Sequence, residues 1–232
     1  MKVAICFSGH LRNFSNLLEN FKEKILSLRK DHQVDVFFSI WDIYEPKYSW
    51  TNENETISNL IDTEDLSELD PIKIEVENFN QIKGQFLLKN FTTEGLNEEY
   101  NRLIKDGILH STPMFYKIYK ANKLKKDYEK INNFKYDIAI RYRSNLLING
   151  NIDLNINKNI LYNKRENNSN LDDIFAYSDS ETMDKYSDLY LNLSLILNKY
   201  RRFGPEEILY DWIINENKIP RKDTSFSIDI IR

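Results

Sequence analysis

Two arginines and an amide stand at alternate positions at the end of one predicted strand, in the segment Tyr136–Asn145. Isoleucine recurs at every second position earlier in this segment, which is the pattern of a buried strand. Side chains two residues apart on a strand share a face, so Arg141, Arg143 and Asn145 should project together if the extended conformation continues. The spacing therefore predicts a polar group that carries two positive charges.

These two charges predict an anion. Burying an unpaired charge costs several kcal/mol, and ligands of open α/β sheets bind outside the carboxyl ends of the strands. A diphosphate suits the planar guanidinium group, whose N–H donors pair with phosphate oxygens. The alternative is that both arginines pair with structural carboxylates or lie in solvent.

A second candidate anion site is the turn Ser8-Gly9-His10-Leu11-Arg12. Gly9 permits close backbone approach, the free amides of the next helix favour an anion, and Arg12 adds a charge. A plain tight turn is the alternative, because one glycine is not a GxGxxG fingerprint and no GxxxxGK[ST] sequence occurs.

Several carboxylates are candidates for proton transfer. Asp172 and Asp173 precede a short predicted strand; such residues are commonly solvated, yet one held near a cationic site could act as general base. Glu206 is a second candidate, although the helix macrodipole already favours acidic residues where a helix begins. Asp42 follows a predicted strand, where a contact with a ribose or a base is plausible.

Other common catalytic patterns are absent from the sequence. The three histidines are scattered without HExxH or paired spacing, which argues against a zinc site. No GxSxG elbow supports Ser-His-Asp catalysis. The single cysteine, Cys6, lies within the first predicted strand, where we expect it to pack in the core.

The elements that would position these residues begin with a strand, a helix and a second strand. Val3–Phe7 and Val34–Ile40 are continuous apolar runs of the buried, parallel type, and apolar residues at helical spacing between them predict a helix from Phe14 to about Lys30. This order favours a parallel, right-handed unit. We therefore predict one α/β domain over residues 1–232, with a mixed, mainly parallel sheet flanked by helices.

The middle of the chain is less regular. Residues 43–70 are polar and acidic, which predicts a loop or insertion with little core of its own. Alternation at residues 72–77 predicts a half-exposed or edge strand. Residues 78–110 are ambiguous, with a helix possible at Phe86–Phe91. We treat about 43–110 as a variable segment.

Helices dominate the second half. Apolar spacing predicts a long amphipathic helix after Pro113, with Lys117, Lys120, Lys123 and Lys126 mostly on solvated faces. Ser180 is the expected N-cap of another helix that continues to about Tyr200. The remaining predicted elements are short strands at 160–162, 174–177 and 226–231, and a helix from Gly204 through 214.

Composition limits the class of protein. Of the 232 residues, 41% are hydrophobic and 29% charged, which supports a packed core rather than global disorder. A net charge of −4 implies no broad basic surface for nucleic acid. The apolar run at the N-terminus is too short for a signal peptide, and no stretch approaches the ~20 residues of a membrane span. We expect a reducing, cytoplasmic compartment, and peripheral contact with a membrane stays open.

Taken in order, several of these stretches resemble a group of small GT-A-like glycosyltransferases found in bacterial surface-polysaccharide loci and in viruses. The resemblance covers most of the chain. It is carried by residues 6–12, 35–42, 141–143 and 172–178, with further likeness at 111–122 and 205–206.

The resemblance implies a sheet that binds a nucleotide-sugar donor at its carboxyl edge and passes the sugar to a glycan acceptor. Many GT-A enzymes hold a divalent metal with Asp-x-Asp, which this chain lacks; Arg-x-Arg stands in its place, and Asn145 where the pattern has Asp. Asn is a poor sole metal anchor, so we expect Arg141 and Arg143 to neutralise the diphosphate directly. If a metal is used, Asp172 and Asp173 are the candidate ligands.

In this hypothesis Ser8, Gly9 and Arg12 contact the nucleotide side, with Asp42 and Asn145 as further donor contacts. Asp173 is the first candidate for the base and Glu206 the second. Two other classes stay open. One is another nucleotide-dependent group transferase, such as a phosphotransferase or methyltransferase, and the other is a non-catalytic glycan-binding or scaffold protein on a degenerate transferase fold.

Overall fold

The structure, a computed structural model, describes residues 1–12, 14–42, 64–88, 91, 104–105, 108–167 and 169–231. The strands are β1 Lys2–Gly9, β2 Gln33–Trp41, β3 Lys73–Glu77, β4 Ile104–Lys105, β5 Ile108–Leu109, β6 Ile138–Tyr142, β7 Leu146–Asn149, β8 Leu161–Asn167, β9 Asn170–Ser178, β10 Arg221–Lys222 and β11 Ser227–Ile230. The α-helices are α1 Phe14–Lys24, α2 Glu64–Ser67, α3 Phe79–Ile82, α5 Thr112–Ile131, α6 Ser180–Ser187, α7 Leu189–Tyr200 and α8 Pro205–Tyr210. Short 3₁₀ turns at Leu26–Lys30 (η1) and Lys83–Phe86 (η2) and a π-helix at Asp211–Glu216 (η3) complete the set.

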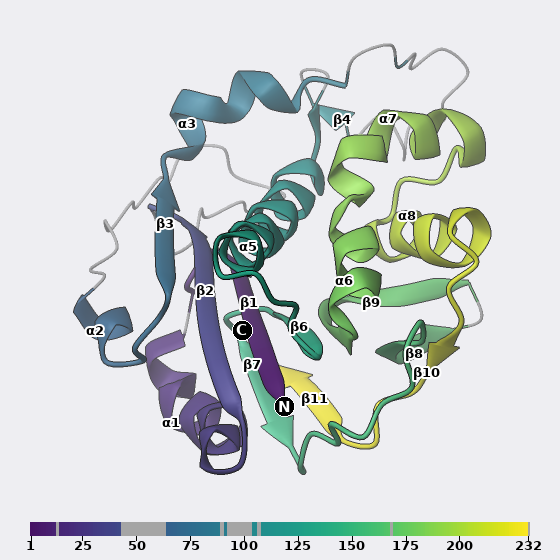
Figure 1. Cartoon of the computed structure of the whole chain (residues 1–232). Coiled ribbons are helices and arrows are strands. Elements are labelled where there is room, and N and C mark those ends of the chain that lie inside the picture. The colour runs from purple at the N-terminus through teal and green to yellow at the C-terminus, as the bar shows by residue number, and fades with distance from the viewer. Residues whose placement is uncertain are drawn as a thin grey trace.

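A seven-stranded sheet forms the centre of the molecule, in the order β10-β8-β9-β6-β1-β2-β3 (Figure 1). The four strands β3, β2, β1 and β6 are parallel, whereas β9 pairs antiparallel with both β6 and β8. This is the predicted mixed, mainly parallel sheet flanked by helices, and the prediction is confirmed. The extent of one domain, with a variable segment at about 43–110, stays a prediction.

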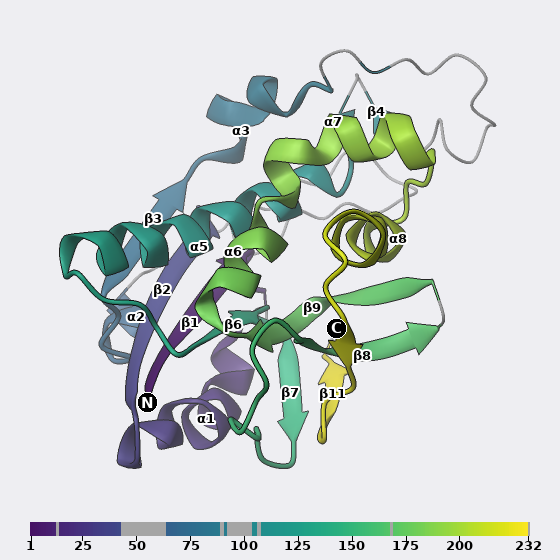
Figure 2. The same ribbon diagram turned by 45° about the vertical axis from the view of Figure 1, so that its right-hand side comes forward.

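Each face of the sheet is covered by a different layer (Figure 2). On one face α1 and the small antiparallel pair β7–β11 enclose a core that includes Ile5, Phe7 and Tyr142. On the other face α5, α6, α7 and α8 pack over a core that includes Ala4 and Ala139. Successive residues of β1 and β6 thus point to opposite layers, as the period of two in a strand requires. No helix among the described residues has both the length and the apolar character needed to cross a membrane.

The first half of the chain follows the predicted order, with two corrections. The first helix ends at Lys24 and the 3₁₀ turn η1 takes its place up to Lys30. Most of the segment 43–70 lies outside the described residues, but Leu66 and Leu69, at its end, are buried in the core, which the prediction of little core content missed. β3 lies at the edge of the sheet, as predicted.

Residues 78–110, whose secondary structure the sequence left ambiguous, contain two short helical turns in their described part. The two short turns α3 and η2 cover residues 79–86, and Phe86 is buried against Trp41 and Tyr116. A helix over Phe86–Phe91 is not formed in its described part, because the helical turn ends at Phe86. Residues 89–90 lie outside the described part of the chain.

Helix α5 corrects the expectation of a solvated lysine face. Lys117 is fully buried, since its ammonium group pairs with Glu77 of β3 at 2.7 Å and lies over the ring of Trp41. Lys125, on the same helix, is fully buried as well. Lys123 has the expected exposure and forms an ion pair with Asp127, one helical turn further along.

The Arg-rich strand is shorter than predicted. β6 ends at Tyr142, the chain turns, and β7 begins at Leu146 on the other layer of the molecule. Arg143 and Asn145 therefore do not continue the strand face on which Arg141 lies. The terminal strand β11 pairs with β7 rather than with the main sheet.

Two further element boundaries, the start of β9 and the start of α6, differ from the prediction. Strand β9 begins at Asn170, so Asp172 and Asp173 are buried within a strand instead of preceding it. Asp179, not Ser180, caps α6, because its carboxylate accepts a hydrogen bond from the backbone N–H of Thr182. The helix predicted to run to Tyr200 is divided at Asp188 into α6 and α7.

Candidate functional site

The predicted site residues gather where the parallel strands end. Ser8 of β1 is in register with Ser39 of β2, and Phe7 is in register with Tyr142, the last residue of β6. The hydroxyl of Ser144 donates a hydrogen bond of 2.5 Å to the carbonyl of His10. This bond joins the turn after β6 to the loop after β1, so the two candidate anion sites are parts of one edge of the sheet.

Arg141 is the buried member of the Arg-x-Arg element. Its side chain lies on the α5 face and is 2% exposed, and its Nε and Nη1 atoms have no hydrogen-bond partner. Burial lowers the pKa of the guanidinium, and Arg143 acts in the same direction, while Tyr186, Asp173 and Asp172 oppose the shift. Because an arginine remains charged in proteins, this is a buried cation whose donors are only partly satisfied.

A cavity of about 10 Å³ lies beside Arg141, lined by Cys6, Asn122, Met183, Tyr186 and Ser187 among others. This volume is close to the minimum that holds one water molecule. The hydroxyl of Tyr186 faces Arg141, without a hydrogen bond of good geometry to any of the described residues. Burial raises the pKa of the Cys6 thiol to about 12, so this cysteine stays protonated and is a core residue rather than a nucleophile.

Arg143 and Asp173 face each other at the same edge. The distance from Arg143 Nη1 to Asp173 Oδ1 is 3.8 Å, and the two side chains are 21% and 9% exposed. No hydrogen bond joins them. The structure thus brings together the predicted diphosphate ligand and the first candidate for the base, which lie thirty residues apart in the chain.

The loop after β1 has the properties expected of a close backbone approach. Gly9 has a φ of +111°, and, apart from its two chain neighbours, none of the described residues places an atom within 4 Å of the position that a Cβ would occupy. Arg12 is partly buried with a φ of 48°. The hydroxyl of Ser8 is buried without a hydrogen-bond partner. A ligand oxygen near this loop would meet an unused hydroxyl and open space above glycine.

Two of the proposed donor contacts, Asp42 and Asn145, also have hydrogen-bond partners within the fold. The carboxylate of Asp42 accepts a hydrogen bond of 2.6 Å from the side chain of Asn78, which caps α3. Asn145 is buried, and both its side-chain amide and its backbone carbonyl bind the backbone of Ile231. These contacts give both residues a structural task.

Glu206 lies partly exposed in the first turn of α8, a helix that packs against β9. Its neighbour Glu207 closes the capping box with the backbone N–H of Gly204. The start of a helix favours a carboxylate electrostatically, which accounts for both residues without a catalytic role.

The described residues fit a divalent metal poorly. They contain no group of three or more His, Cys, Asp or Glu side chains that could hold one. Of the two candidate ligands, Asp172 uses Oδ1 to accept a hydrogen bond from the backbone N–H of Ile174, and Asp173 faces Arg143. Hard cations require several oxygen ligands, which these two residues do not supply.

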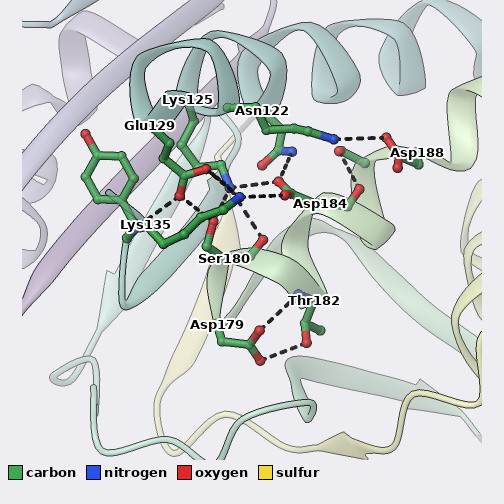
Figure 3. A network of polar contacts seen from close by, with 12 residues as sticks. Asn122, Lys125, Glu129, Lys135, Asp179, Ser180, Thr182, Asp184 and Asp188 are labelled. Atoms are coloured by element: carbon green, nitrogen blue, oxygen red, sulfur yellow. Dashed lines mark hydrogen bonds and ion pairs between the residues drawn. The ribbon is translucent and has the colours of Figure 1, made fainter. Parts of the chain in front are cut away.

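A second charged group on the α5 face was not predicted from the sequence (Figure 3). Buried Lys125 binds the hydroxyl of Ser180, Asp184 at 2.8 Å and Glu129 at 3.5 Å. Glu129 also accepts hydrogen bonds from Ser180 and from the backbone N–H of Tyr136. The available signal was the spacing of Lys125 and Glu129, which places them on one side of the helix.

No protein-family model matches the chain, and no curated protein matches it. Several solved structures are similar, and two of them cover 96% of this chain. One is a glycosyltransferase involved in the glycosylation of the major capsid of PBCV-1, with 9% identity, a TM-score of 0.38 and 81% of that chain covered. The other is mouse xyloside xylosyltransferase 1 in its apo form, with 11% identity, a TM-score of 0.44 and 85% of that chain covered. Likeness at this level assigns no activity, so a functional proposal depends on the site itself.

Proposed function

We propose that this protein is a glycosyltransferase that moves a sugar from a nucleotide-sugar donor to a hydroxyl of a glycan acceptor. The observation that carries the proposal is the pair of arginines at the carboxyl edge of the parallel strands. Among the described residues, Arg141 is buried with unpaired Nε and Nη1 atoms, and Arg143 has one loose ion pair, with Asp173. Two such cations favour an anionic ligand at the position where open α/β sheets bind their ligands.

Each element of the edge has a role in this proposal. Arg143, the more exposed arginine, binds the diphosphate, and Arg141 strengthens the positive potential from below. Ser8, Gly9 and Arg12 contact the nucleotide side. Fixed positive charge then stabilises the diphosphate as it leaves with the electron pair of the broken sugar–oxygen bond.

Asp173 is proposed as the base. It accepts the proton of the acceptor hydroxyl as that oxygen forms its bond to the anomeric carbon. Glu206 is the second candidate. A single displacement with a carboxylate base inverts the anomeric configuration, which makes inversion the simplest outcome.

Direct neutralisation by arginine makes a metal unnecessary in this proposal. The donor set supports it, because Asp172 and Asp173 already have a backbone amide and a guanidinium as neighbours. Activity should therefore persist in EDTA. Loss of activity in EDTA with recovery on adding Mn²⁺ would overturn this part and return both aspartates to the role of metal ligands.

Calorimetry with UDP, GDP, CMP and TDP compounds tests the proposal. We expect one nucleoside diphosphate to bind, and its sugar derivative to be slowly hydrolysed or transferred. No binding of any nucleotide at millimolar concentration would contradict a transferase. Donor binding without release of a nucleoside phosphate would identify a binding protein, and binding of ATP or S-adenosylmethionine would favour another group transferase.

A further inference from the structure

We infer that the Arg143–Asp173 ion pair is exchangeable: it closes the site before the donor binds, and the donor diphosphate takes Arg143 and releases Asp173. This inference rests on the proposed function and adds an order of events to it. The donor binds first, and the base becomes available to the acceptor hydroxyl afterwards.

The pair is looser than the hydrogen-bonded ion pairs of low exposure, such as those of Lys117 and Lys125. Its closest recorded contact is 3.8 Å, without a hydrogen bond. Lys117 and Glu77 approach to 2.7 Å and form a hydrogen bond. A guanidinium and a carboxylate can form two parallel hydrogen bonds, and Arg143 and Asp173 make neither. Their attraction is therefore the easier one to replace.

The Arg202–Asp211 pair shows what a structural guanidinium–carboxylate pair looks like in this protein. Arg202 donates from two nitrogen atoms to the two oxygens of the buried Asp211, at 2.8 Å for Nε and at a shorter distance for Nη2. Asn215 donates a further hydrogen bond to Asp211. Arg143 has the same chemistry available but holds Asp173 through one long contact, so its donors are available for a better acceptor.

A diphosphate is a better acceptor than Asp173 in this geometry. Its oxygens carry more charge and can accept two hydrogen bonds from one guanidinium group. Arg141 lies close enough to influence both Arg143 and Asp173, and its own Nε and Nη1 are unpaired. The positive charge of the site therefore favours an incoming diphosphate over the single carboxylate that it would displace.

Release of Arg143 changes what Asp173 can do. While the guanidinium of Arg143 faces Asp173, it competes with an acceptor hydroxyl for the carboxylate oxygen Oδ1. Among the described residues, Asp173 has no hydrogen bond to hold it once the arginine leaves. Its carboxylate is then able to take the acceptor proton. Before the donor binds, the guanidinium of Arg143 faces this carboxylate. An order of donor before acceptor follows.

The test is the affinity of Asp173→Asn for the nucleoside diphosphate that binds the wild-type protein, and for inorganic pyrophosphate. If Asp173 competes for Arg143, removal of its charge should strengthen binding by roughly two- to tenfold, the range expected for a modest ion pair. Transfer to an acceptor should be lost. Unchanged or weaker binding would overturn the exchange, and weaker binding that depends on Mn²⁺ would indicate a metal ligand.

Two matched variants separate competition from a general change in charge. Asp172→Asn removes the same charge one residue away and keeps the Oδ1 acceptor for Ile174. An equal gain in this variant would overturn the pairing. In an Arg143→Gln background the gain from Asp173→Asn should disappear. If the wild-type protein binds neither nucleotide nor pyrophosphate, the proposed function fails as well, and that result differs from binding that Asp173→Asn does not improve.

Discussion

Two neighbouring groups of charges, one on the α5 face of the sheet and one at its carboxyl edge, differ in how completely their charges are paired. In the group around Lys125, the buried ammonium has Ser180, Asp184 and Glu129 as partners (Figure 3). In the group at the carboxyl edge, Arg141 has two unpaired nitrogen atoms and Arg143 has one long contact. The side chain of Asn122 borders both, since it donates to Asp184 and lines the cavity beside Arg141.

The difference separates structural charges from candidate binding charges within one layer of the protein. Buried charges contribute to a stable fold only where their hydrogen bonds are completed. The Lys125 group meets this condition through residues of α5 and α6, and so joins the two helices. At the carboxyl edge, the described residues leave hydrogen bonds of the arginines unmade. An anion from outside the protein would supply the missing acceptors. Substitutions that remove one charge from either group test whether that charge serves stability or binding.

The largest effect is expected from Lys125→Met. Loss of the ammonium leaves Glu129 and Asp184 with one fewer counter-charge, and breaking a buried pair costs roughly 3–5 kcal/mol. Urea denaturation followed by circular dichroism measures this loss. Lys123→Met, on an exposed face of the same helix, is the control and should change the free energy of unfolding by less than about 0.5 kcal/mol. Equal losses in the two variants would show that the network contributes little.

Arg143→Ala should weaken donor binding while leaving the stability of the fold nearly unchanged, the reverse of the result expected for Lys125→Met. The fold should persist, because the ion pair that this side chain makes within the described part of the chain is long, at 3.8 Å. Charge-assisted contacts are worth roughly 1.5–3 kcal/mol, so donor affinity should fall by about one to two decades. Calorimetry with the bound nucleotide checks this. A variant that unfolds, with unchanged affinity in the folded fraction, would make Arg143 structural.

A smaller effect on the free energy of unfolding, one that depends on pH, is expected from substitution of Asp179, the N-cap of α6. Burial alone would raise the pKa of this carboxyl, but hydrogen bonds from the backbone of Asn159 and from Thr182 outweigh burial and lower it below its usual 3.8. A lowered folded-state pKa means that the ionised group stabilises the fold above pH 3.8 and loses this effect as pH falls through the folded value.

Asp179→Asn should therefore cost about 1 kcal/mol at neutral pH. The difference from wild type should shrink as the pH falls below about 4. Thermal denaturation across this range measures it, with the exposed Glu181→Gln in the same helix turn as control. A difference that stays constant with pH would show that the charge of Asp179 does not contribute.

The order of the first elements, and the strand edge at which Arg141 lies, could be predicted from the sequence because they depend on local patterns. Continuous apolar runs identify β1 and β2, and strand ends identify the edge at which Arg141 lies. Two residues that the sequence treats separately, Arg143 and Asp173, are brought together because β6 and β9 pair in the sheet.

The features that could not be predicted are those that depend on contacts between residues far apart in the sequence. Lys117 has a spacing typical of a solvated face, and its burial depends on Glu77, forty residues earlier in the chain. Asn145 stays a predicted donor contact, but the hydrogen bond from its side-chain amide to Ile231, near the end of the chain, could not be predicted. The strand stops at Tyr142, and the turn that follows is held by the bond from Ser144 to His10. No local pattern contains these partners.

The smallest effect on stability, and the most direct test of the comparison, is expected from Arg141→Met. This substitution removes a buried charge that has no close carboxylate and keeps a long side chain, so the free energy of unfolding should stay unchanged or rise by up to about 1 kcal/mol. The same change at Arg202, which has a bidentate partner in buried Asp211, should instead cost roughly 2–4 kcal/mol. Chemical denaturation of the two variants compares one substitution in two settings. A loss above about 2 kcal/mol in Arg141→Met would mean that the protein itself satisfies this cation. Stability retained together with weakened donor binding would instead identify Arg141 as a charge that the fold keeps for its ligand.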